Sequence, residues 1–360
     1  MADQNSMNPI DVSRLGQINL AGGSVANDNA MFLKVFSGEV LQTFEEANLM
    51  MPLHTVRTIS SGREAQFPVM GTATAAYHTP GESIMGSFVD DGSGTAGVGE
   101  AGEGKYLSRI KHAERKIGID GTLVSSAFIA DIDEAKNHYD VRAAYTTQIG
   151  RELAYHSDRA LIHTIIGGAR ETNDRFGGTE ARYLGEDIVG DGGDGSYSDV
   201  DLIQTIASVA QKMDEKNVPS EGRYVIFNPA TYYTLVKSGN NAINTDFGGM
   251  GSIATGEVTQ VSGIRILKSN HVPSTNLTQS IFNDNSIANN PLGGTTGYAG
   301  NFAKTVGVAF QTEGVGTVKL LDLALESEYQ LDRLGTLMVA KYAMGHGVLR
   351  EECCYEIKTT

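Results

Sequence analysis

Two overlapping glycine patterns in this chain match a motif that binds dinucleotides. Gly92, Gly94 and Gly97 fit G-x-G-x-x-G, and Gly97 begins a second match with Gly99 and Gly102. The motif needs a buried strand before it and a helix after it, so that the pyrophosphate meets a helix N-terminus. Here further glycines follow, and glycine abundance alone explains the match. We therefore expect no dinucleotide site.

A partial phosphate loop overlaps the same stretch. Gly99 to Lys105 fits G-x-x-x-x-G-K, but the next residue is Tyr106, so the hydroxyl that would hold magnesium is missing. No strand-like sequence delivers this loop. A soluble α+β enzyme that uses residues 91–104 as a nucleotide-binding lid is therefore the alternative interpretation and not the preferred one.

The histidines do not form a recognisable catalytic or metal site. His138, His156 and His163 could lie on one helix, but none is three or four residues from another, the spacing that lets two ligands reach one ion. His346 lies between two glycines without a nearby serine, cysteine or carboxylate set to complete a nucleophilic arrangement. We predict structural histidines, no catalytic residue, no metal and no cofactor, and hence no enzyme.

Composition limits the class of protein. The chain has 360 residues, of which 40% are hydrophobic, enough for a sizeable core in one or two domains. Its formal net charge of −15 argues against a general nucleic-acid-binding surface. The two cysteines, Cys353 and Cys354, are adjacent, a spacing that rarely meets disulfide geometry. We expect a soluble protein from a reducing compartment, with no membrane span and no secretion signal.

The elements around the glycine-rich stretch are more informative than the stretch itself. Strand-like sequence lies on both sides of it, in residues 56–77 and 111–129, which predicts the two arms of a long hairpin. The residues between Asp91 and Gly104 cannot bury a core of their own. A local basic strip formed by Lys105, Arg109, Lys111, Arg115 and Lys116 is interpreted as a solvated charged face.

One uncommonly long helix is predicted after the hairpin. It begins at Asp131 with a D-x-x-E pattern that resembles a capping box, and Gly167 with Gly168 is expected to end it. Apolar residues recur along it at helical spacing, including Val141, Ile149 and Leu161. A core helix laid on a sheet is the common role of such an element, and a coiled coil is less favoured because no heptad is sustained. A long helix beside an arm without a core is nevertheless typical of an assembly subunit.

The remaining pattern predicts the α+β class, because helices and strands mix without regular βαβ alternation. Residues 1–30 read as a flexible arm. We expect helices at 31–44, from Asp199 as N-cap to before Pro219, and at 229–236, and strands at 224–227, 264–267, 305–311, 318–325 and 337–344.

Several sequence strings carry a family resemblance that composition cannot. They are FLKVFSGEVLQTF (32–44), RTISSGREAQFPVMG (57–71), AAYHTPGE (75–82), KHAERKIGIDG (111–121), DIDEAKNHYDVRAAYTTQIGRELA (131–154), VGTVKLLDLALE (315–326) and AKYAMGHGVLR (340–350). Together they resemble the major capsid proteins of short-tailed phages (podoviruses) of the coliphage T-seven group. The run from Val89 to Tyr106 departs from that pattern as an enlarged loop tip, and residues 177–197 offer no string that anchors an alignment.

The resemblance implies the Hong Kong 97-type shell fold, with an N-terminal arm, an extended loop, a peripheral domain built on a spine helix, and an axial domain. The implied division is 1–55 for the arm, 56–77 for the start of the peripheral domain, 78–115 for the extended loop, 116–167 for the peripheral domain with the spine helix at 131–166, 168–314 for the axial domain, 315–347 for the return to the peripheral domain, and 348–360 for a C-terminal segment.

The resemblance also implies a function, which is to tile an icosahedral shell of hexamers and pentamers around phage double-stranded DNA. It implies inter-subunit contacts between the extended loop and a spine helix at Glu82, Lys105, Arg109, Lys111, Arg115, Asp140, Arg142 and Arg151, with arm contacts at Phe32, Phe36 and Phe44.

The implied partners are other copies of the chain, a scaffolding protein during assembly, a portal at one vertex, and DNA held without sequence-specific contacts. The resemblance leaves room for an outer cement or decoration protein, and it places assembly in the bacterial cytoplasm. A compartment of the same fold that encloses an enzyme cargo is a third interpretation, which the phage-like strings disfavour.

Overall fold

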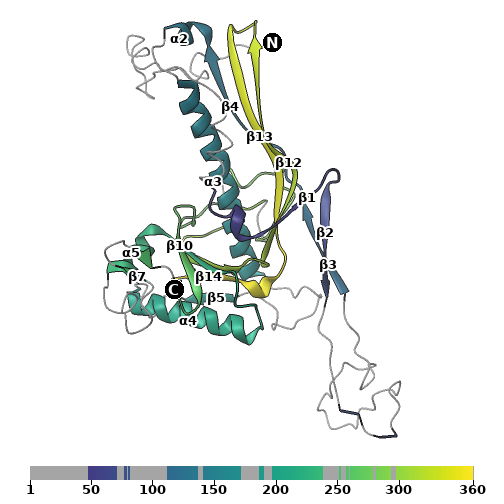
Figure 1. Cartoon of the computed structure of the whole chain (residues 1–360), viewed down its shortest axis with the longest axis vertical. Helices are drawn as coiled ribbons and strands as arrows, with labels where there is room; N and C mark the ends of the chain where they lie inside the picture. The colour runs from purple at the N-terminus through teal and green to yellow at the C-terminus, as the bar shows by residue number, and fades with distance from the viewer. Residues whose placement is uncertain are drawn as a thin grey trace.

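The computed structural model describes residues 48–70, 77–78, 80–81, 112–136, 141–171, 186–189, 197–237, 251–252, 257–258, 260–278, 281–292 and 297–359. Its parts are arranged around one long helix (Figure 1). A narrow sheet runs along one half of this helix, a second sheet with two covering helices lies at its other half, and a two-stranded arm projects from the side. Helices and strands mix as the α+β prediction expects.

The long helix is α3 (Val141–Arg170), and it is preceded by the short helix α2 (Asp131–Ala135). The prediction of one continuous helix from Asp131 is wrong, because α2 ends at Ala135 and Lys136 forms a turn. The Asp131 carboxylate accepts a hydrogen bond from the Tyr329 hydroxyl at 2.6 Å. Asp131 therefore links α2 to a distant strand.

The predicted glycine stop at the end of the helix is also wrong. Gly167 and Gly168 lie inside α3, which continues to Arg170. A Cβ atom on Gly167 would lie 2.6 Å from the Cβ of Pro291 and 2.7 Å from its carbonyl oxygen. On Gly168, a Cβ would meet Val348 and Cys354 at 3.0–3.2 Å. These glycines allow close packing of the helix and do not end it.

The first sheet has four strands in the order β1 (Thr55–Thr58), β12 (Val315–Gln330), β13 (Gly335–Val348) and β4 (Leu123–Ala130). Strands β12, β13 and β4 are antiparallel neighbours, whereas β1 runs parallel to β12. One face of this sheet packs on the first half of α3 through Ile149, Leu153 and Ala154, which are at most 6% exposed. The far ends of β12 and β13 extend beyond this core.

The second sheet has six strands in the order β5 (Glu186–Val189), β14 (Cys354–Lys358), β11 (Thr305–Gln311), β6 (Arg223–Phe227), β10 (Ile264–Lys268) and β9 (Gln260–Val261). Both of its faces are buried. Val225 and Phe227 of β6 pack with α4 (Asp199–Glu215) and α5 (Pro229–Lys237), whereas Ile226 packs with the second half of α3. Period-two alternation therefore divides β6 between two cores.

The projecting arm is formed by β2 (Glu64–Met70) and β3 (His112–Gly118), which pair antiparallel from Glu64 opposite Gly118 to Met70 opposite His112. This pairing confirms that strands lie on both sides of the glycine-rich stretch. The shorter elements are η2 (Met51–Leu53), η5 (Glu351–Cys353), β7 (Gly251–Ser252) and β8 (Glu257–Val258).

Most of the other predicted elements are confirmed, with corrections at their ends. Asn228 caps α5 through its side chain, which accepts from the Ala230 N–H at 3.1 Å, and Pro229 opens the helix as expected. The N-cap of α4 is Ser198 and not Asp199, because Ser198 and Asp201 form a reciprocal capping box. Strands β12 and β13 are longer than predicted. The predicted helix at 31–44 and the glycine-rich stretch lie outside the described residues.

The tight contact of Gly167 gives a test in which helix propensity and packing predict opposite signs. Gly167→Ala would gain roughly 1 kcal/mol from propensity alone. We expect it instead to destabilise the subunit by about 1–3 kcal/mol, because the new methyl meets the Pro291 backbone. Urea unfolding followed by circular dichroism measures the difference, with the exposed Gln148→Ala of the same helix as a matched control. A Gly167→Ala protein more stable than wild type would contradict the packing described here.

Candidate assembly surface

The projecting arm is fixed to the body at its foot, near Gly118. The Asn289 side chain bonds both backbone groups of Gly118, accepting from its N–H at 3.0 Å and donating to its carbonyl at 2.7 Å. The backbone N–H of Ile119 donates to the Arg63 carbonyl at 2.9 Å, which continues the pairing past β2. Gly345 of β13 packs so closely on the Gly118 carbonyl that a Cβ would overlap it. These contacts fix the base of β2 and β3 on the body.

An ion pair also attaches the arm to the body. Arg115 of β3 pairs with Glu351, whose side chain is 1% exposed. A carboxylate buried to this extent requires a charged or hydrogen-bonding partner. Arg115 is one of the predicted inter-subunit residues, and within the described structure its guanidinium contacts its own chain.

Few of the other predicted contact residues can be placed. Arg151 is exposed on α3, and Arg142 lies in the first turn of α3. The remaining predicted contacts lie outside the described residues: Glu82, Lys105, Arg109, Lys111, Asp140, Phe32, Phe36 and Phe44. The structure therefore describes α3 and the base of the arm, and the set of inter-subunit contacts stays a prediction.

Large apolar side chains are exposed at the far end of the first sheet. Ile132, Tyr329, Leu331 and Leu334 are 46–79% exposed, and they come from α2, from the end of β12 and from the connection between β12 and β13. This end of the molecule lies opposite the second sheet (Figure 1). Clustered exposed apolar side chains are typical of protein–protein contact surfaces.

A buried polar junction lies behind these surfaces. Asp158 of α3 is fully buried, and its carboxylate accepts from the backbone N–H groups of Leu49 and Met50 at 2.9 and 3.1 Å. The ring of His271 lies 3.1 Å from the same carboxylate. One carboxylate on the helix thus binds the start of the described chain and a loop of the second sheet.

A chain of hydrogen bonds with an assignable direction crosses the first sheet. The Nδ1 of His54 lies 2.7 Å from the Met50 carbonyl, which can only accept, so this nitrogen carries the proton. The Nε2 of His54 must then accept from the Thr317 hydroxyl at 2.6 Å. The Thr317 oxygen in turn accepts from the Nδ1 of His346 at 2.9 Å. Both imidazoles are neutral in this arrangement, and His346 has a structural role, as predicted.

The chain continues to a carboxylate at the foot of the arm. The backbone N–H of His346, and not its imidazole, donates to the Tyr298 hydroxyl at 3.0 Å, and this hydroxyl donates to Asp120 at 2.6 Å. Asp120 also accepts from the Ala288 N–H at 2.8 Å and from the Asn289 side chain at 3.2 Å. Burial raises the pKa of Asp120 to about 6 despite these bonds. Burial likewise raises the pKa of the Tyr298 hydroxyl, which keeps it a donor.

Burial lowers the pKa of three imidazoles at this junction, those of His156, His163 and the His346 already described. The pKa of His156 falls to about 4, and those of His163 and His346 fall to about 3. His163 bonds the Tyr298 carbonyl at 2.9 Å through Nδ1 and stacks on Phe302 at 4.5 Å between ring centroids. Its Nε2 has no hydrogen-bond partner among the described residues. These side chains pack as neutral rings, so protonation would disrupt the junction.

The end of α3 is tied to the second sheet by a buried ion pair. Arg170 donates to Glu356 of β14 through Nε at 2.7 Å and through an Nη at 2.6 Å. Glu356 is fully buried and also accepts from the Thr305 hydroxyl at 2.5 Å. Sequence analysis missed both Glu356 and Asp158. The pattern of a buried strand that carries a charged residue could have indicated Glu356, whereas nothing local marks Asp158.

The described residues hold no group of three or more histidine, cysteine, aspartate or glutamate side chains that could bind a metal. No helix in the described part of the chain has both the length and the apolar character to cross a membrane. The two nucleotide-motif matches lie outside the described residues. What the geometry offers is a rigid body with a projecting arm, exposed apolar ends and a neutral buried junction.

Comparison with known proteins is consistent with this description. A family model named Gp10A-like, described as major capsid protein, matches residues 95–358. The major capsid protein of Enterobacteria phage T3 is 32% identical over 344 residues, which cover 92% of each chain. That of Escherichia phage T7 is 31% identical over 342 residues, 90% of each chain. A solved capsid structure of the Cyanophage P-SCSP1u has 39% identity and a TM-score of 0.70, and it covers 97% of this chain and 98% of that one.

The lowered imidazole pKa values predict loss of stability in acid. An imidazole with a pKa of 6.5 when unfolded and about 3 to 4 when folded stabilises the fold fully above pH 6.5, and the contribution is lost as pH falls toward 4. The raised pKa of Asp120 acts in the opposite direction, because the folded chain binds a proton there as pH falls through 6. This offsets about one of the three protons that the unfolded imidazoles bind. With about 1.4 kcal/mol per proton and pH unit, we expect a loss of about 3 kcal/mol between pH 6 and 5.

Urea unfolding of the purified subunit at pH 7, 6 and 5 measures this slope. His163→Phe keeps an aromatic ring beside Phe302 and removes one titrating group. This substitution should reduce the pH dependence of the free energy of unfolding by about one proton, whatever its effect on stability at pH 7. Equal stability at the three pH values would show that these imidazoles do not remain neutral in the folded subunit.

The Arg170–Glu356 pair predicts a large effect from a single truncation. Arg170→Ala leaves a buried carboxylate without its bidentate partner, and we expect a loss of about 3–5 kcal/mol in the free energy of unfolding. The matched control is Lys341→Ala, which breaks the more exposed pair with Glu326 and should cost less than about 1 kcal/mol. Similar losses for the two variants would mean that the pair at the end of α3 is not desolvated.

Proposed function

The chain belongs to the Gp10A-like family of major capsid proteins, and from this premise we propose how its parts build and hold the phage shell. The observation that carries the proposal is the 32% identity to a phage major capsid protein over 92% of both chains. The family consists of structural capsid proteins, so we reject the alternative that residues 91–104 form the lid of a nucleotide-binding enzyme. The chain is a component of the virion shell and not an enzyme.

The proposed domains follow the arrangement of the Hong Kong 97-type shell fold. Residues 1–55 act as the N-terminal arm, 78–115 as the extended loop, and 168–314 as the axial domain. The peripheral domain is assembled from 56–77, 116–167 and 315–347, and 348–360 is the C-terminal segment. Two described features support this plan: α3 has a separate core with each sheet, and β2 and β3 project from the body.

Assembly then depends on many weak contacts made together. We propose that each extended loop lies across the spine helix of a neighbouring copy. The contacts would join Glu82, Lys105, Arg109, Lys111 and Arg115 of the loop to Arg142 and Arg151 of α3 and to Asp140, which directly precedes α3 in the sequence. The anchoring of β2 and β3 at Gly118 supports this, because it fixes the base of the loop on the body of its own subunit. Hundreds of such contacts in a closed shell let modest pairwise energies resist the internal pressure of DNA.

The proposed partners follow from the shell. Copies of the chain form hexamers and pentamers, a scaffolding protein directs assembly in the host cytoplasm, and a portal occupies one vertex. The net charge of −15 supports an inner wall that holds double-stranded DNA without binding it, because like charges limit adhesion. Glycines at the loop tip allow one sequence to bend differently in hexamers and pentamers.

Expression with and without a scaffolding partner tests the proposal. We expect shells tens of nanometres wide with the partner, measured by sedimentation and negative-stain microscopy. Replacing residues 82–109 by a short Gly-Ser linker should abolish shells and leave the circular dichroism spectrum and urea midpoint close to wild type. This is expected because the described core lies outside these residues.

The linker variant separates assembly from folding. Shells of normal size from this variant would overturn the role of the loop. A wild-type chain that stays monomeric with the scaffolding partner would overturn the proposed assembly itself.

A further inference from the structure

A cavity of about 140 Å³ lies at the foot of the arm, and its lining comes from four parts of the fold. These are the turn after β3, the helix α3, the connection between β10 and β11, and β13. A polar cavity of this size has room for several water molecules. The titratable side chains that line it are Asp120, His156, Asp284, Tyr298, Tyr342 and His346.

Asp120 ties the foot of the arm to the connection between β10 and β11. One carboxylate oxygen accepts from the Tyr298 hydroxyl at 2.6 Å. The other accepts from the Ala288 N–H at 2.8 Å and from the Asn289 side chain at 3.2 Å. Hydrogen bonds to an ionised acceptor are about twice as strong as bonds to a neutral one. The strength of this attachment therefore depends on the charge of Asp120.

The Tyr298 hydroxyl has a second acceptor within reach. The carbonyl of His346 lies 3.3 Å from it, and the backbone N–H of His346 donates to the same hydroxyl at 3.0 Å. When Asp120 takes up a proton from solvent, its new O–H can donate to the Tyr298 oxygen, and the Tyr298 hydroxyl then donates to the His346 carbonyl. Asn289 and Ala288 remain bonded, but to a neutral oxygen. The cluster thus has two bonded arrangements, of which the neutral one holds the foot more weakly.

We propose that Asp120 is a proton-operated latch, whose charged form holds the arm in one direction and whose neutral form lets the arm turn about its foot. The latch is a property of the single subunit. It goes beyond the proposed function and does not depend on it.

Among the side chains that line the cavity, Asp120 is the one whose charge changes near pH 6 in the folded chain. Burial raises its pKa to about 6. Burial lowers the pKa of His156 to about 4 and that of His346 to about 3, and the positive charge of Arg159 on α3 adds to the effect on His156. Both imidazoles therefore stay neutral at pH 5.5, where about three quarters of the Asp120 carboxyl groups are protonated.

The other titratable side chains of the lining keep their charge state over the same range. Hydrogen bonds from Ser286 lower the pKa of Asp284, so this carboxylate stays charged. Burial raises the pKa of the Tyr298 and Tyr342 hydroxyls, so both stay protonated. A change of the arm between pH 7.5 and 5.5 is then a readout of Asp120.

The contact beneath the arm permits a rotation. β3 crosses β13 at two glycines, where a Cβ on Gly345 would overlap the Gly118 carbonyl and a Cβ on Gly347 would lie 2.8 Å from Ile117. At these positions β13 presents backbone and no side chain to β3. The Ile117 side chain is fully buried and serves as the pivot. The ion pair of Arg115 with Glu351 is a second attachment, so the arm turns without leaving the body.

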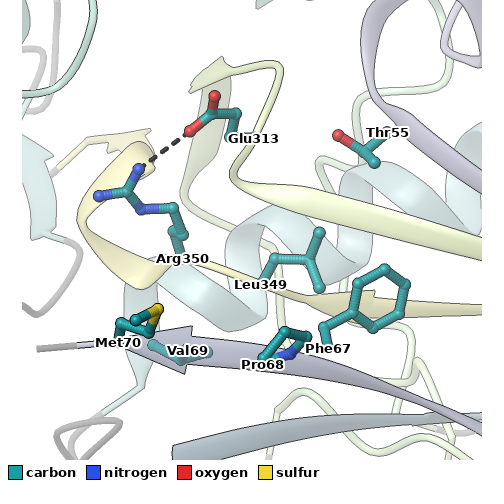
Figure 2. Close-up of a pocket in the computed structure, with 8 residues that line it drawn as sticks. All are labelled: Thr55, Phe67, Pro68, Val69, Met70, Glu313, Leu349 and Arg350. Atoms are coloured by element: carbon teal, nitrogen blue, oxygen red, sulfur yellow. Dashed lines mark hydrogen bonds and ion pairs between the residues drawn. The ribbon is translucent and has the colours of Figure 1, made fainter. Parts of the chain in front are cut away.

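Open space lies beside the arm. Figure 2 shows β2 on one side of a groove and the segment that follows β13 on the other. The groove has a volume of about 400 Å³ and separates Phe67 and Met70 of the arm from Leu349 and Arg350. Arg350 pairs with Glu313 at 2.9 Å and so belongs to the body (Figure 2). A turn of the arm changes the width of this groove.

Spin-label distances in the unassembled full chain test the latch. Met70→Cys on the arm is paired in turn with Val124→Cys on β4 and Val200→Cys on α4, all at exposed positions, whereas Cys353 and Cys354 are fully buried and should not react. Double electron–electron resonance gives the distance distributions from pH 7.5 to 5.5. We expect at least one arm–body distribution to broaden or shift, with a midpoint near pH 6. Unchanged distributions for both pairs would overturn the inference.

A pair within the body separates the latch from a general loss of packing. Val124→Cys with Val200→Cys reports on the two sheets without the arm. Its distribution should be the same at pH 7.5 and 5.5. If it changes together with the arm–body pairs, the arm follows a loosening of the whole subunit and the latch is ruled out.

Two substitutions identify the carboxylate. Asp120→Asn keeps the shape and removes the charge, so the arm should show its low-pH distribution already at pH 7.5 and should not respond to acid. Asp284→Asn is the matched control, because Asp284 lines the same cavity but bonds Ser286 within its own turn. It should respond as the wild type does. A pH response that survives Asp120→Asn, or that is lost in Asp284→Asn, contradicts the inference.

Tyr298→Phe tests the latch without changing the carboxylate. It removes a hydrogen bond to the charged form of Asp120, so the neutral form should appear at higher pH. We expect the midpoint of the arm–body change to move above that of the wild type. An unchanged or lower midpoint would show that Asp120 does not control the arm.

Discussion

The fold depends on one helix having two cores. The first half of α3 packs on the first sheet through Ile149 and Leu153, and its second half packs on the second sheet through Leu161 and Ile165. Between these contacts lies Asp158, which binds the start of the described chain and a loop of the second sheet. Because each half of this helix packs on one sheet, the helix fixes how the two sheets are placed relative to each other. In a shell built from repeated copies, that fixed placement sets how one subunit meets the next.

The buried junction explains how this rigidity is reached without a continuous apolar core. Neutral imidazoles, a threonine and a tyrosine hydroxyl connect the Met50 carbonyl to Asp120 through hydrogen bonds, and the backbone N–H of His346 makes the link to Tyr298. A network of buried hydrogen bonds of this kind specifies one arrangement of its elements, because any slip leaves further buried polar groups unpaired. The same property makes it sensitive to protons. Rigidity and acid sensitivity therefore have a common physical origin in this protein.

Sequence patterns predicted the elements with local signals and missed those that depend on distant partners. The strand and helix around Asn228 and Pro229, and the pairing of segments on both sides of the glycine-rich stretch, follow from turn chemistry and alternation. The glycine stop at Gly167 failed because Pro291, far along the chain, needs that glycine for packing. For the same reason, Asp158 and Glu356 could not be recognised as structural residues. The family could be recognised because whole strings of residues match, although the contact residues on the loop stay predictions.

The position of β14 has a consequence for the order of events in the cell. This strand is the last described strand in the chain, yet it lies inside the second sheet, between β5 and β11, and its Glu356 holds the end of α3. The ribosome must therefore release nearly all of the described chain before this sheet can close and the helix can be secured. A nascent subunit lacks one of its two finished halves until that point. We therefore expect that a chain without β14 cannot complete the second sheet.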